Sequence, residues 1–287
     1  AEAEEDADQD FVSVEDYPID SNIGYYPGCV DYLDQEMVFS HVNEGEMNLG
    51  AATTSAYTLF DEIGIDVSYL GRDFLKCCGH DQKWQGLTEV FDKLKAYNQK
   101  KIQQSGIDTL VSSCAECFRT FARDYELEDV KVMHTTEFLL EQGFDMDLKV
   151  AEETTVTYHD PCRLGRQMGI YEEPRELITA VEGVNLVEME HSGEDAMCCG
   201  VSSMMSCNEN ARALRVSRME EIKSTGADTM LTSCPKCVTH FECLKFEDDD
   251  KYSDIKILDV VTFLAQQINE KKSKIAEEAI TTIETEA

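Results

Sequence analysis

The sequence predicts an α/β fold with two similar lobes from an internal duplication, each with a small, mainly parallel sheet flanked by helices. Two observations support this prediction. Short apolar runs, typical of buried strands, alternate with helical patterns, an order typical of parallel sheets covered on both faces. In addition, the stretch from Gly106 to Cys114 recurs from Gly226 to Cys234, with five of the nine residues identical. Such self-similarity indicates a repeated structural unit.

The chain is expected to divide into four segments. Residues 1–20 carry nine acidic side chains and no basic one, which predicts an acidic N-terminal arm with no core of its own. The first repeat occupies residues 21–148 and the second occupies residues 149–268, with a polar boundary between them. Residues 269–287 are expected to form a polar C-terminal tail.

Each repeat is expected to contain four short buried strands. They are predicted at residues 23–26, 67–70, 109–112 and 130–133 of the first repeat and at 155–158, 185–188, 229–232 and 255–258 of the second. Apolar residues at spacings of three and four predict a helix with an apolar face in the first repeat, formed by Leu87, Val90, Phe91, Leu94 and Tyr97. Residues 212–222 predict a similar helix in the second.

Composition and charge exclude several classes of protein. The chain has 287 residues, with 25 Lys or Arg and 58 Asp or Glu, so its net charge is −33. An acidic surface repels phosphate backbones, and we therefore expect no nucleic-acid partner. No apolar run approaches the ~20 residues of a membrane helix, so no membrane insertion by this chain is expected. The N-terminus does not resemble a secretory signal, which predicts a cytoplasmic protein, at most peripheral to a membrane through a partner.

The twelve cysteines are the most informative residues. Ten of them form two sets of five in the same order: a single Cys, a Cys-Cys-Gly and a Cys-x-x-Cys. The first set is Cys29, Cys77, Cys78, Cys114 and Cys117, and the second is Cys162, Cys198, Cys199, Cys234 and Cys237. Each Cys-x-x-Cys follows a strand and begins a helix, where sites form in open α/β sheets and where the helix N-terminus favours thiolate. The glycine after each adjacent pair permits the sharp turn that two neighbouring thiols need to share a site.

Five thiols exceed the four that a tetrahedral zinc site or an ordinary cubane cluster requires. The sets therefore indicate a larger or unusual cluster, or one spare thiol for chemistry. Cys207 and Cys243 lie outside both sets and are expected to be buried core thiols or else accessory ligands. The chain contains no ferredoxin-type cysteine run, so electrons are expected to arrive from, or leave to, another subunit.

The doubled pattern Cys…Cys-Cys-Gly…Cys-x-x-Cys resembles that of the CCG-domain proteins, which include the catalytic B and D subunits of heterodisulfide reductase. The stretch from Tyr158 to Arg166 is similar to the D-subunit branch, and the resemblance covers roughly residues 22–265. It implies two non-cubane [4Fe-4S] clusters, one held by each set of five cysteines. In heterodisulfide reductases the disulfide of coenzyme M and coenzyme B binds between the clusters and is split by one-electron transfers. The resemblance thus also implies a role in methanogenesis.

The sequence departs from the family pattern at two places. The interval from Cys29 to Cys77 is 48 positions, against 36 from Cys162 to Cys198. The extra length lies around residues 31–55 and is expected to bind a partner or to gate the site. After the second Cys-Cys-Gly, many relatives carry a glycine run, but residues 201–205 here read Val-Ser-Ser-Met-Met. The cluster pocket or the substrate channel is therefore expected to differ from that of those relatives at this place.

An anionic substrate such as these coenzymes needs local positive charge in an acidic protein. The candidate catalytic residues, all close in sequence to cluster cysteines, are His159, Arg163, Arg166 and Lys236. Alternatively, the two arginines pair with structural acids or balance the charge of a cluster. His159 and His240 are candidates to donate protons to a nascent thiolate, or are structural groups.

Three functions remain open at this point. The first is a catalytic iron–sulfur subunit that reduces or forms the CoM-S-S-CoB disulfide by one-electron steps. The second is a subunit that relays electrons in a respiratory or flavin-linked complex without cleaving a disulfide. The third is a zinc-stabilised scaffold without redox chemistry, which the Cys-Cys-Gly pairs disfavour. The expected partners are a ferredoxin-like iron–sulfur subunit, similar to the C subunit of heterodisulfide reductase, and a flavin or haem subunit.

Overall fold

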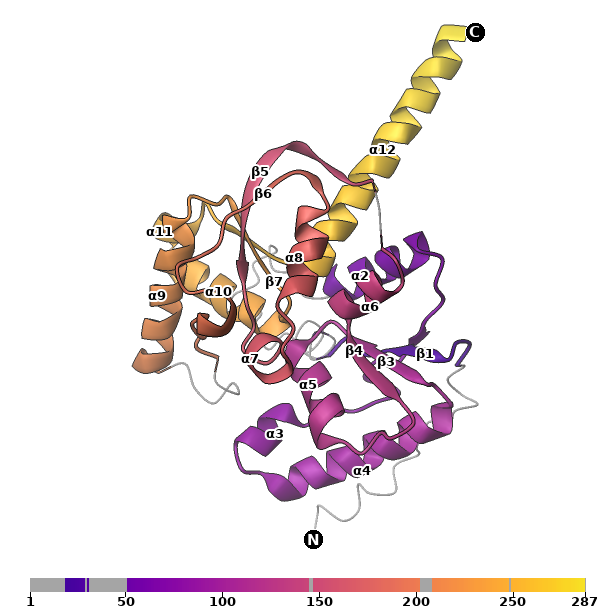
Figure 1. The fold of residues 1–287 in the computed structure, drawn as a ribbon, viewed down its shortest axis with the longest axis vertical. Helices are drawn as coiled ribbons and strands as arrows, with labels where there is room; N and C mark the ends of the chain where they lie inside the picture. Colours follow the sequence, from indigo (N-terminus) through magenta and orange to yellow (C-terminus); the bar gives the residue numbers. More distant parts are fainter. Residues whose placement is uncertain are drawn as a thin grey trace.

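The computed structural model describes residues 19–28, 30, 51–144, 147–201, 208–247 and 249–286. These residues form two four-stranded sheets with the same strand order, flanked by helices (Figure 1). The predictions for the acidic arm before residue 19, for Cys29, for residues 31–50, for residues 202–205 and for Cys207 lie outside the described residues. Residues 51–55 of the longer first interval belong to a helix.

The first lobe carries its strands in the spatial order β2-β1-β3-β4, and each neighbouring pair is parallel. The strands are β1 (Ile23–Tyr25), β2 (Ser68–Tyr69), β3 (Thr109–Ser112) and β4 (Lys131–His134). The helices are α2 (Ala51–Glu62), α3 (His80–Trp84), α4 (Thr88–Ser105), α5 (Ala115–Asp124) and α6 (Thr135–Glu141).

The second lobe repeats this arrangement in the order β6-β5-β7-β8, again with parallel pairs. The strands are β5 (Lys149–His159), β6 (Glu182–Leu186), β7 (Thr229–Thr232) and β8 (Lys256–Asp259). The helices are α7 (Gly165–Met168), α8 (Glu172–Thr179), α9 (Glu209–Ser224), α10 (Pro235–Glu247), α11 (Asp249–Tyr252) and α12 (Val260–Glu286), and a 3-10 turn, η2, spans Gly193–Asp195. The predicted α/β class and the two similar lobes are confirmed.

All eight predicted strands are present, and the largest difference in length is at β5. This strand begins at Lys149 rather than at Thr155, and its pairing with β6 shifts register between Lys149 and Thr154. Most side chains of this outer half are exposed or half-buried. Because the prediction relied on an apolar run, it located only the buried end of the strand.

The apolar face predicted for the helix in the first repeat is only partly buried. Phe91 of α4 is buried, but Leu87, just before the helix, and Val90 are about half exposed. The buried face of α4 instead carries a polar residue, Asn98. Its side chain accepts a hydrogen bond from the N–H of Lys76 at 2.9 Å and donates to the carbonyls of Lys76 and Cys77. The inner face of α4 thus supports a polar loop, which apolar spacing alone does not show.

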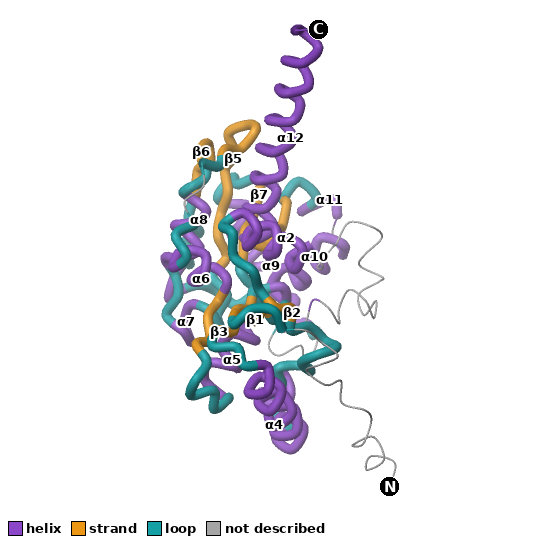
Figure 2. Tube along the Cα trace, turned by 90° about the vertical axis from the view of Figure 1, so that its right-hand side faces the viewer, coloured by secondary structure: helices purple, strands orange, loops and turns teal. Residues whose placement is uncertain are grey.

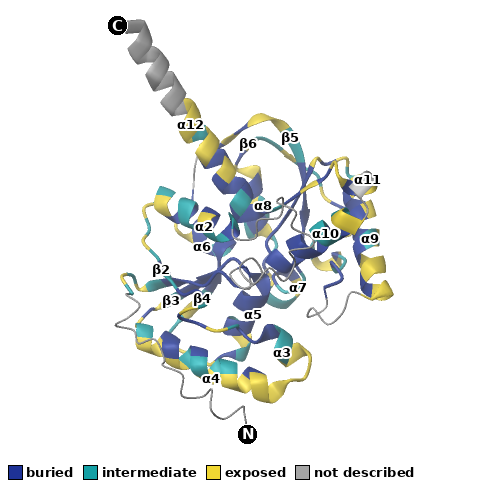
Figure 3. Cartoon of the chain, turned by 180° about the vertical axis from the view of Figure 1, so that it is seen from behind, coloured by how far each residue is buried: buried dark blue, intermediate teal, exposed yellow. Residues whose placement is uncertain are grey.

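Hydrophobic core clusters extend across both lobes, and the helix contacts that join the lobes are reciprocal. The helix after the last strand of each lobe packs on the helix before the second strand of the other, so that α6 contacts α8 and α12 contacts α2. Buried side chains of both sheets, among them Val111, Met133, Val156 and Leu231, belong to one cluster with residues of these helices. Figure 3 shows buried stretches in α12, α6 and β4. The lobes are therefore held in a fixed relation by burial of apolar surface.

Helix α12 continues without a break across the boundary predicted at residue 268. Its later turns project beyond both lobes (Figures 1 and 2), and Lys272 lies 2.5 Å from a carboxylate oxygen of Glu62 in α2. The segment predicted as a polar tail is therefore helical as far as Glu286. Across the described ranges, we find no helix with the length and apolar character required to span a bilayer.

A buried carboxyl group at the end of β8 predicts a pH-dependent contribution to stability. Burial raises the pKa of Asp259 from 3.8 to about 7, although its Oδ1 accepts the N–H of Val261 at 3.0 Å. Between about pH 4 and 7 the folded chain therefore holds a proton that the unfolded chain has released, so this group makes stability fall as pH rises.

Asp259→Asn is expected to remove this contribution. The stability of the variant relative to the native chain should rise by up to about 4 kcal/mol from pH 4 to pH 7. Denaturant unfolding at a series of pH values measures the difference, with Asp254→Asn, at an exposed position, as control. Parallel curves for the native chain and Asp259→Asn would contradict the prediction.

Candidate functional site

The second set of cysteines gathers at the carboxyl ends of the strands of its sheet. Cys162 follows β5, Cys234 follows β7, and Cys237 lies in the first turn of α10. The adjacent pair lies in the loop after the turn η2. Gly200, which follows this pair, has φ of +85°, as predicted for a sharp turn, and its N–H donates to the Sγ of Cys198 at 3.3 Å.

Contacts between thiols link all five sulfurs of the second set. The Sγ atoms of Cys199 and Cys237 lie 3.2 Å apart, and further hydrogen bonds join Cys162 to Cys198, Cys198 to Cys199 and Cys234 to Cys237. Hydrogen bonds from Cys162 and Cys199 lower the pKa of Cys198. The hydrogen bond that Cys199 donates to Cys198, together with burial, raises the pKa of Cys199, although the hydrogen bond it accepts from Cys237 acts in the opposite direction. No disulfide joins the cysteines that the structure describes. Five reduced thiols in one place are suited to hold a metal cluster.

The first set has the same arrangement on the other sheet. Cys114 follows β3, Cys117 lies in the first turn of α5, and the Sγ of Cys117 lies 3.3 Å from that of Cys78. Gly79 has φ of +81°, and its N–H donates to the Sγ of Cys77 at 3.5 Å. Four cysteines of this set therefore share the geometry of their counterparts in the second.

The chain passes the first set at Gly28, the residue before Cys29. Gly28 has φ of +86°, and a Cβ atom there would lie 2.6 Å from the Cβ of Cys114 and 3.4 Å from the sulfurs of Cys114 and Cys117. Because no real Cβ atom tolerates a contact of 2.6 Å, only glycine fits between the backbone and these cysteines. The close approach brings the residue before Cys29 to the Cys-x-x-Cys of this set.

Gly28→Ala is therefore expected to displace the Cys-x-x-Cys of the first lobe and to lower the iron content of that set. Gly143→Ala is the matched control, since Gly143 has φ of +74° with nothing within 4 Å of the added Cβ atom. Both variants should lose about 1–2 kcal/mol of stability from the left-handed backbone, but only the first should lose iron. Equal iron content in the two variants would contradict this account.

An ion-pair network connects the middle residues of the two Cys-x-x-Cys motifs across the lobe boundary. The Nζ of Lys236 lies 2.5 Å from the Oε2 of Glu116 and 2.6 Å from both carboxylate oxygens of Asp81. His80 Nδ1 lies 3.0 Å from Asp81 and 3.3 Å from Glu116. Burial opposes ionisation of Asp81, but the hydrogen bond from His80 and the charge of Lys236 lower its pKa. The predicted anion-binding Lys236 is thus buried between two carboxylates that compensate its charge.

The two predicted arginines occupy different places. The Arg163 guanidinium lies 3.8 Å from the centre of the Trp84 ring, a cation–π contact between the lobes. Arg166 donates to the carbonyls of Glu194, at 3.2 Å, and Ala196. Arg163 therefore lies at the lobe boundary, whereas Arg166 fixes the loop that leads to Cys198.

The structure also identifies two buried arginines of α9 that the sequence prediction missed. Arg215 and Arg218 are 1% and 0% exposed. They lie on one helical face with the buried Met219 and Ile222, at spacings of three and four. Basic residues on an otherwise apolar face are the sequence signal that would have singled them out.

His159, the fourth predicted residue, is buried beside the second set. One of its ring nitrogens lies within 4.8 Å of the sulfurs of Cys199 and Cys237. The Nε of Arg218 donates to its Nδ1 at 3.1 Å. Burial and the charge of Arg218 lower the pKa of His159, and burial lowers that of His240 to about 4. Both histidines are therefore neutral near pH 7.

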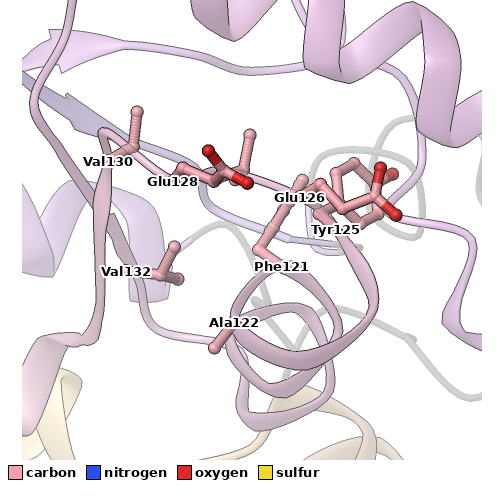
Figure 4. A pocket seen from close by; sticks show the side chains of 8 residues that line it. Phe121, Ala122, Tyr125, Glu126, Glu128, Val130 and Val132 are labelled. Carbon is pink, nitrogen blue, oxygen red and sulfur yellow. The ribbon is translucent and has the colours of Figure 1, made fainter.

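A groove of about 390 Å³ lies on the first lobe (Figure 4). It is lined by residues of α5 and β4 and of the segment between them: Phe121, Ala122, Tyr125, Glu126, Leu127, Glu128, Val130 and Val132. None of the described cysteines lines the groove, but the hydroxyl of its lining residue Tyr125 donates to the carbonyl of Cys78 at 3.0 Å.

Comparisons with known proteins agree with the doubled site. The family model CCG, a cysteine-rich domain, matches residues 23–122 and 156–242. The chain is 31% identical over 260 residues to the D subunit of the dihydromethanophenazine:CoB–CoM heterodisulfide reductase of Methanosarcina acetivorans, covering 86% of this chain and 59% of the relative. It is 28% identical over 249 residues to the B subunit of the fumarate reductase (CoM/CoB) of Methanothermobacter marburgensis, covering 85% of this chain and 46% of the relative.

Further relatives and a solved structure match as well. The chain is 29% identical over 217 residues to the probable iron–sulfur-binding oxidoreductase FadF of Bacillus subtilis, covering 73% of this chain and 30% of the relative. The chain is 26% identical over 227 residues to the EtfAB:quinone oxidoreductase of Syntrophomonas wolfei, covering 75% of this chain and 30% of the relative. The chain thus spans less than two thirds of the length of these relatives. Among solved structures, Picrophilus torridus aspartate racemase matches at 13% identity with a TM-score of 0.33, covering 85% of this chain and 91% of that one. That likeness carries no functional argument.

Proposed function

Because the chain belongs to the CCG family of cysteine-rich domain proteins, we propose that it is the catalytic iron–sulfur subunit of a heterodisulfide reductase-like complex. In this proposal each set of five cysteines holds one non-cubane [4Fe-4S] cluster. The relatives point more broadly to an iron–sulfur oxidoreductase subunit. The disulfide substrate, here CoM-S-S-CoB, is the finer part of the proposal.

The convergence of five thiols is the observation that carries this proposal. The second set links all its sulfurs through direct contacts, with Cys199 and Cys237 3.2 Å apart. A structural zinc ion takes four ligands in a tetrahedron, which would leave one thiol of each set without a function. An iron–sulfur cluster, when bound, accepts and donates single electrons. The ligands would be Cys29, Cys77, Cys78, Cys114 and Cys117 in the first lobe and Cys162, Cys198, Cys199, Cys234 and Cys237 in the second.

The lobe boundary is the place where a substrate would contact both sets. Lys236 and Glu116 form an ion pair there from within the two Cys-x-x-Cys motifs, which brings the motifs together. The guanidinium of Arg163 lies over an aromatic ring, and no carboxylate of the described residues forms an ion pair with it. We therefore assign recognition of an anionic substrate to Arg163, and a role in joining the lobes to Lys236.

Reductive cleavage of a disulfide consumes two electrons and two protons and yields two thiols. His159 and His240 are neutral near pH 7 because burial lowers their pKa values. A neutral imidazole donates a hydrogen bond but is a poor acid. We therefore assign to His159 the donation of a hydrogen bond to sulfur, and the protons would come from solvent at the lobe boundary.

Partners belong to the proposal as well. Electrons would come from a ferredoxin-like iron–sulfur subunit, similar to the C subunit of heterodisulfide reductase, and that partner would in turn receive them from a flavin or haem subunit. This is supported by the names of the relatives, which include subunits of heterodisulfide and fumarate reductases. The complex would be cytoplasmic or peripheral to the membrane through a partner.

The alternative function is electron relay without cleavage of a disulfide. It is favoured by the similarity to the EtfAB:quinone oxidoreductase and, at 29% identity, to the probable iron–sulfur-binding oxidoreductase FadF of Bacillus subtilis. In that case the clusters would carry electrons and the lobe boundary would bind no substrate.

Electron paramagnetic resonance of the anaerobic protein, with and without coenzyme M thiol, separates the two functions. We expect the thiol to produce a new signal, and we expect reduced protein to cleave CoM-S-S-CoB. Arg163→Met should raise the KM for this disulfide more than it lowers kcat, because it removes a charge that binds the substrate. Bound clusters with no response to thiol and no cleavage would establish the relay function instead.

A further inference from the structure

The hydrogen bond between Arg218 and His159 determines which ring nitrogen of the histidine carries the proton. The guanidinium of arginine has donors and no acceptor. Because the Nε of Arg218 lies 3.1 Å from the Nδ1 of His159, this nitrogen must accept, and the neutral ring carries its proton on Nε2. The same arginine donates to the carbonyl of His191 and to Glu221, both at 2.7 Å, which holds the guanidinium in place.

The Nε2 of His159 is buried and has no hydrogen-bond partner among the described residues. Leaving a buried donor unpaired costs about 1–3 kcal/mol, so an acceptor is expected in the functional protein. A ring nitrogen of His159 lies within 4.8 Å of the sulfurs of Cys199 and Cys237. Sulfur of the second cysteine set, or of a cluster held there, is therefore the candidate acceptor.

We propose that Arg218 is a positioning residue that fixes His159 in the tautomer protonated on Nε2, so that this N–H donates to a sulfur of the second cluster site and stabilises its reduced state. The inference rests on the proposed function, since it concerns a cluster held by the second cysteine set. Hydrogen bonds to sulfur are one of the means by which proteins set cluster reduction potentials. The same tautomer excludes His159 as a metal ligand through Nε2.

The first lobe lacks this arrangement at the equivalent positions. The equivalence is shown by Tyr25 and Tyr158, whose hydroxyls lie 3.0 and 3.2 Å from those of Ser113 and Ser233. The residue after Tyr25 is Tyr26, where the second lobe has His159.

The donors at these positions of the first lobe bond to backbone carbonyls. The hydroxyl of Tyr26 donates to the carbonyl of Lys76 at 3.1 Å. Asn98, which takes the place of Arg218 in the repeat, donates to the carbonyls of Lys76 and Cys77 at 3.2 and 3.1 Å. We therefore expect the second cluster to be reduced before the first.

A redox titration of the anaerobic holoprotein, followed by electron paramagnetic resonance, tests the proposal with a double-mutant cycle. His159→Phe and Arg218→Gln should each lower the ratio of reduced to oxidised second cluster about tenfold at a fixed potential, which is ~59 mV for a one-electron couple. The double variant should shift no further, because the two residues act through one hydrogen bond. In protein labelled with ¹⁵N-histidine, the weak nitrogen coupling to the second cluster should disappear in both single variants.

The controls separate this role from a general effect of charge. Arg212→Gln removes the same charge from the same helix, at an exposed residue paired with Glu247, and should leave the potential unchanged. Arg218→Lys keeps a cation beside Glu221, so the reduction potential of the second cluster should fall less than in Arg218→Gln. If Arg218→Gln fails to fold, Arg218→Lys and His159→Phe complete the comparison.

Three outcomes would overturn the proposal. Additive shifts in the double variant would show that Arg218 acts by its charge alone. Unchanged potentials with full iron content would overturn this inference and leave the proposed function intact. Absence of iron from the native chain would overturn both.

Discussion

Cys199→Ser is expected to reduce the iron content from about eight to about four per chain and to abolish cleavage of the disulfide. Cys199 occupies the centre of the second set: its thiol donates to Cys198 and its sulfur lies 3.2 Å from that of Cys237. A serine hydroxyl is a harder ligand that does not replace a thiolate on iron. Iron and acid-labile sulfide assays on anaerobically purified protein measure the loss directly.

The matched control for this change is Cys243→Ser, in the same lobe. Cys243 lies in α10, half-buried against the second lobe's core, and outside the five-cysteine set. This variant should keep its full iron content and its activity. Loss of iron from Cys243→Ser, or full iron in Cys199→Ser, would show that the ligand set is assigned wrongly.

Lys236→Met is expected to destabilise the chain by about 3–5 kcal/mol, because it leaves the buried carboxylate of Glu116 and that of Asp81 without their cation. Denaturant unfolding measures the loss of stability. Lys236→Met combined with Glu116→Gln should recover part of it, since the combined change removes one unpaired charge as well. The stability lost in Lys236→Met is that of the contact between the lobes, because the Lys236–Glu116 ion pair joins the two Cys-x-x-Cys motifs.

The control is Lys149→Met, which removes a lysine from an exposed pair with Glu182 in the same protein. Its stability should not change measurably, because exposed pairs contribute little. If Lys236 instead served to bind an anionic substrate, Lys236→Met would raise KM at unchanged stability. That result would contradict the structural role that we assign to it.

Much of the fold could be predicted because the duplication and the apolar runs agree. Strands β3 and β7 have the predicted bounds, and their two Cys-x-x-Cys motifs begin helices as expected. The exposed half of β5 could not be predicted, since it carries no apolar run. The buried face of α4 could not be predicted from apolar spacing alone, because it includes the polar Asn98, which hydrogen-bonds to the backbone of Lys76 and Cys77.

The cysteines of the candidate site could be predicted from spacing, but their surroundings could not. The four-residue motifs place Glu116 and Lys236 at equivalent positions with opposite charge, yet only the packing of the lobes shows that they meet. Arg215 and Arg218 are charged residues on a buried helical face, and general rules place such residues at the surface. The burial of Arg218 depends on partners such as His159, which is distant in the sequence, and Glu221, which lies on the same helix turn.

The most direct test of the central claim is the content of iron, acid-labile sulfide and zinc per chain in anaerobically purified protein. One four-iron cluster in each cysteine set predicts about eight irons, about eight sulfides and no stoichiometric zinc. Zinc without sulfide would contradict the claim and establish a structural metal site. About four irons would show that only one set holds a cluster.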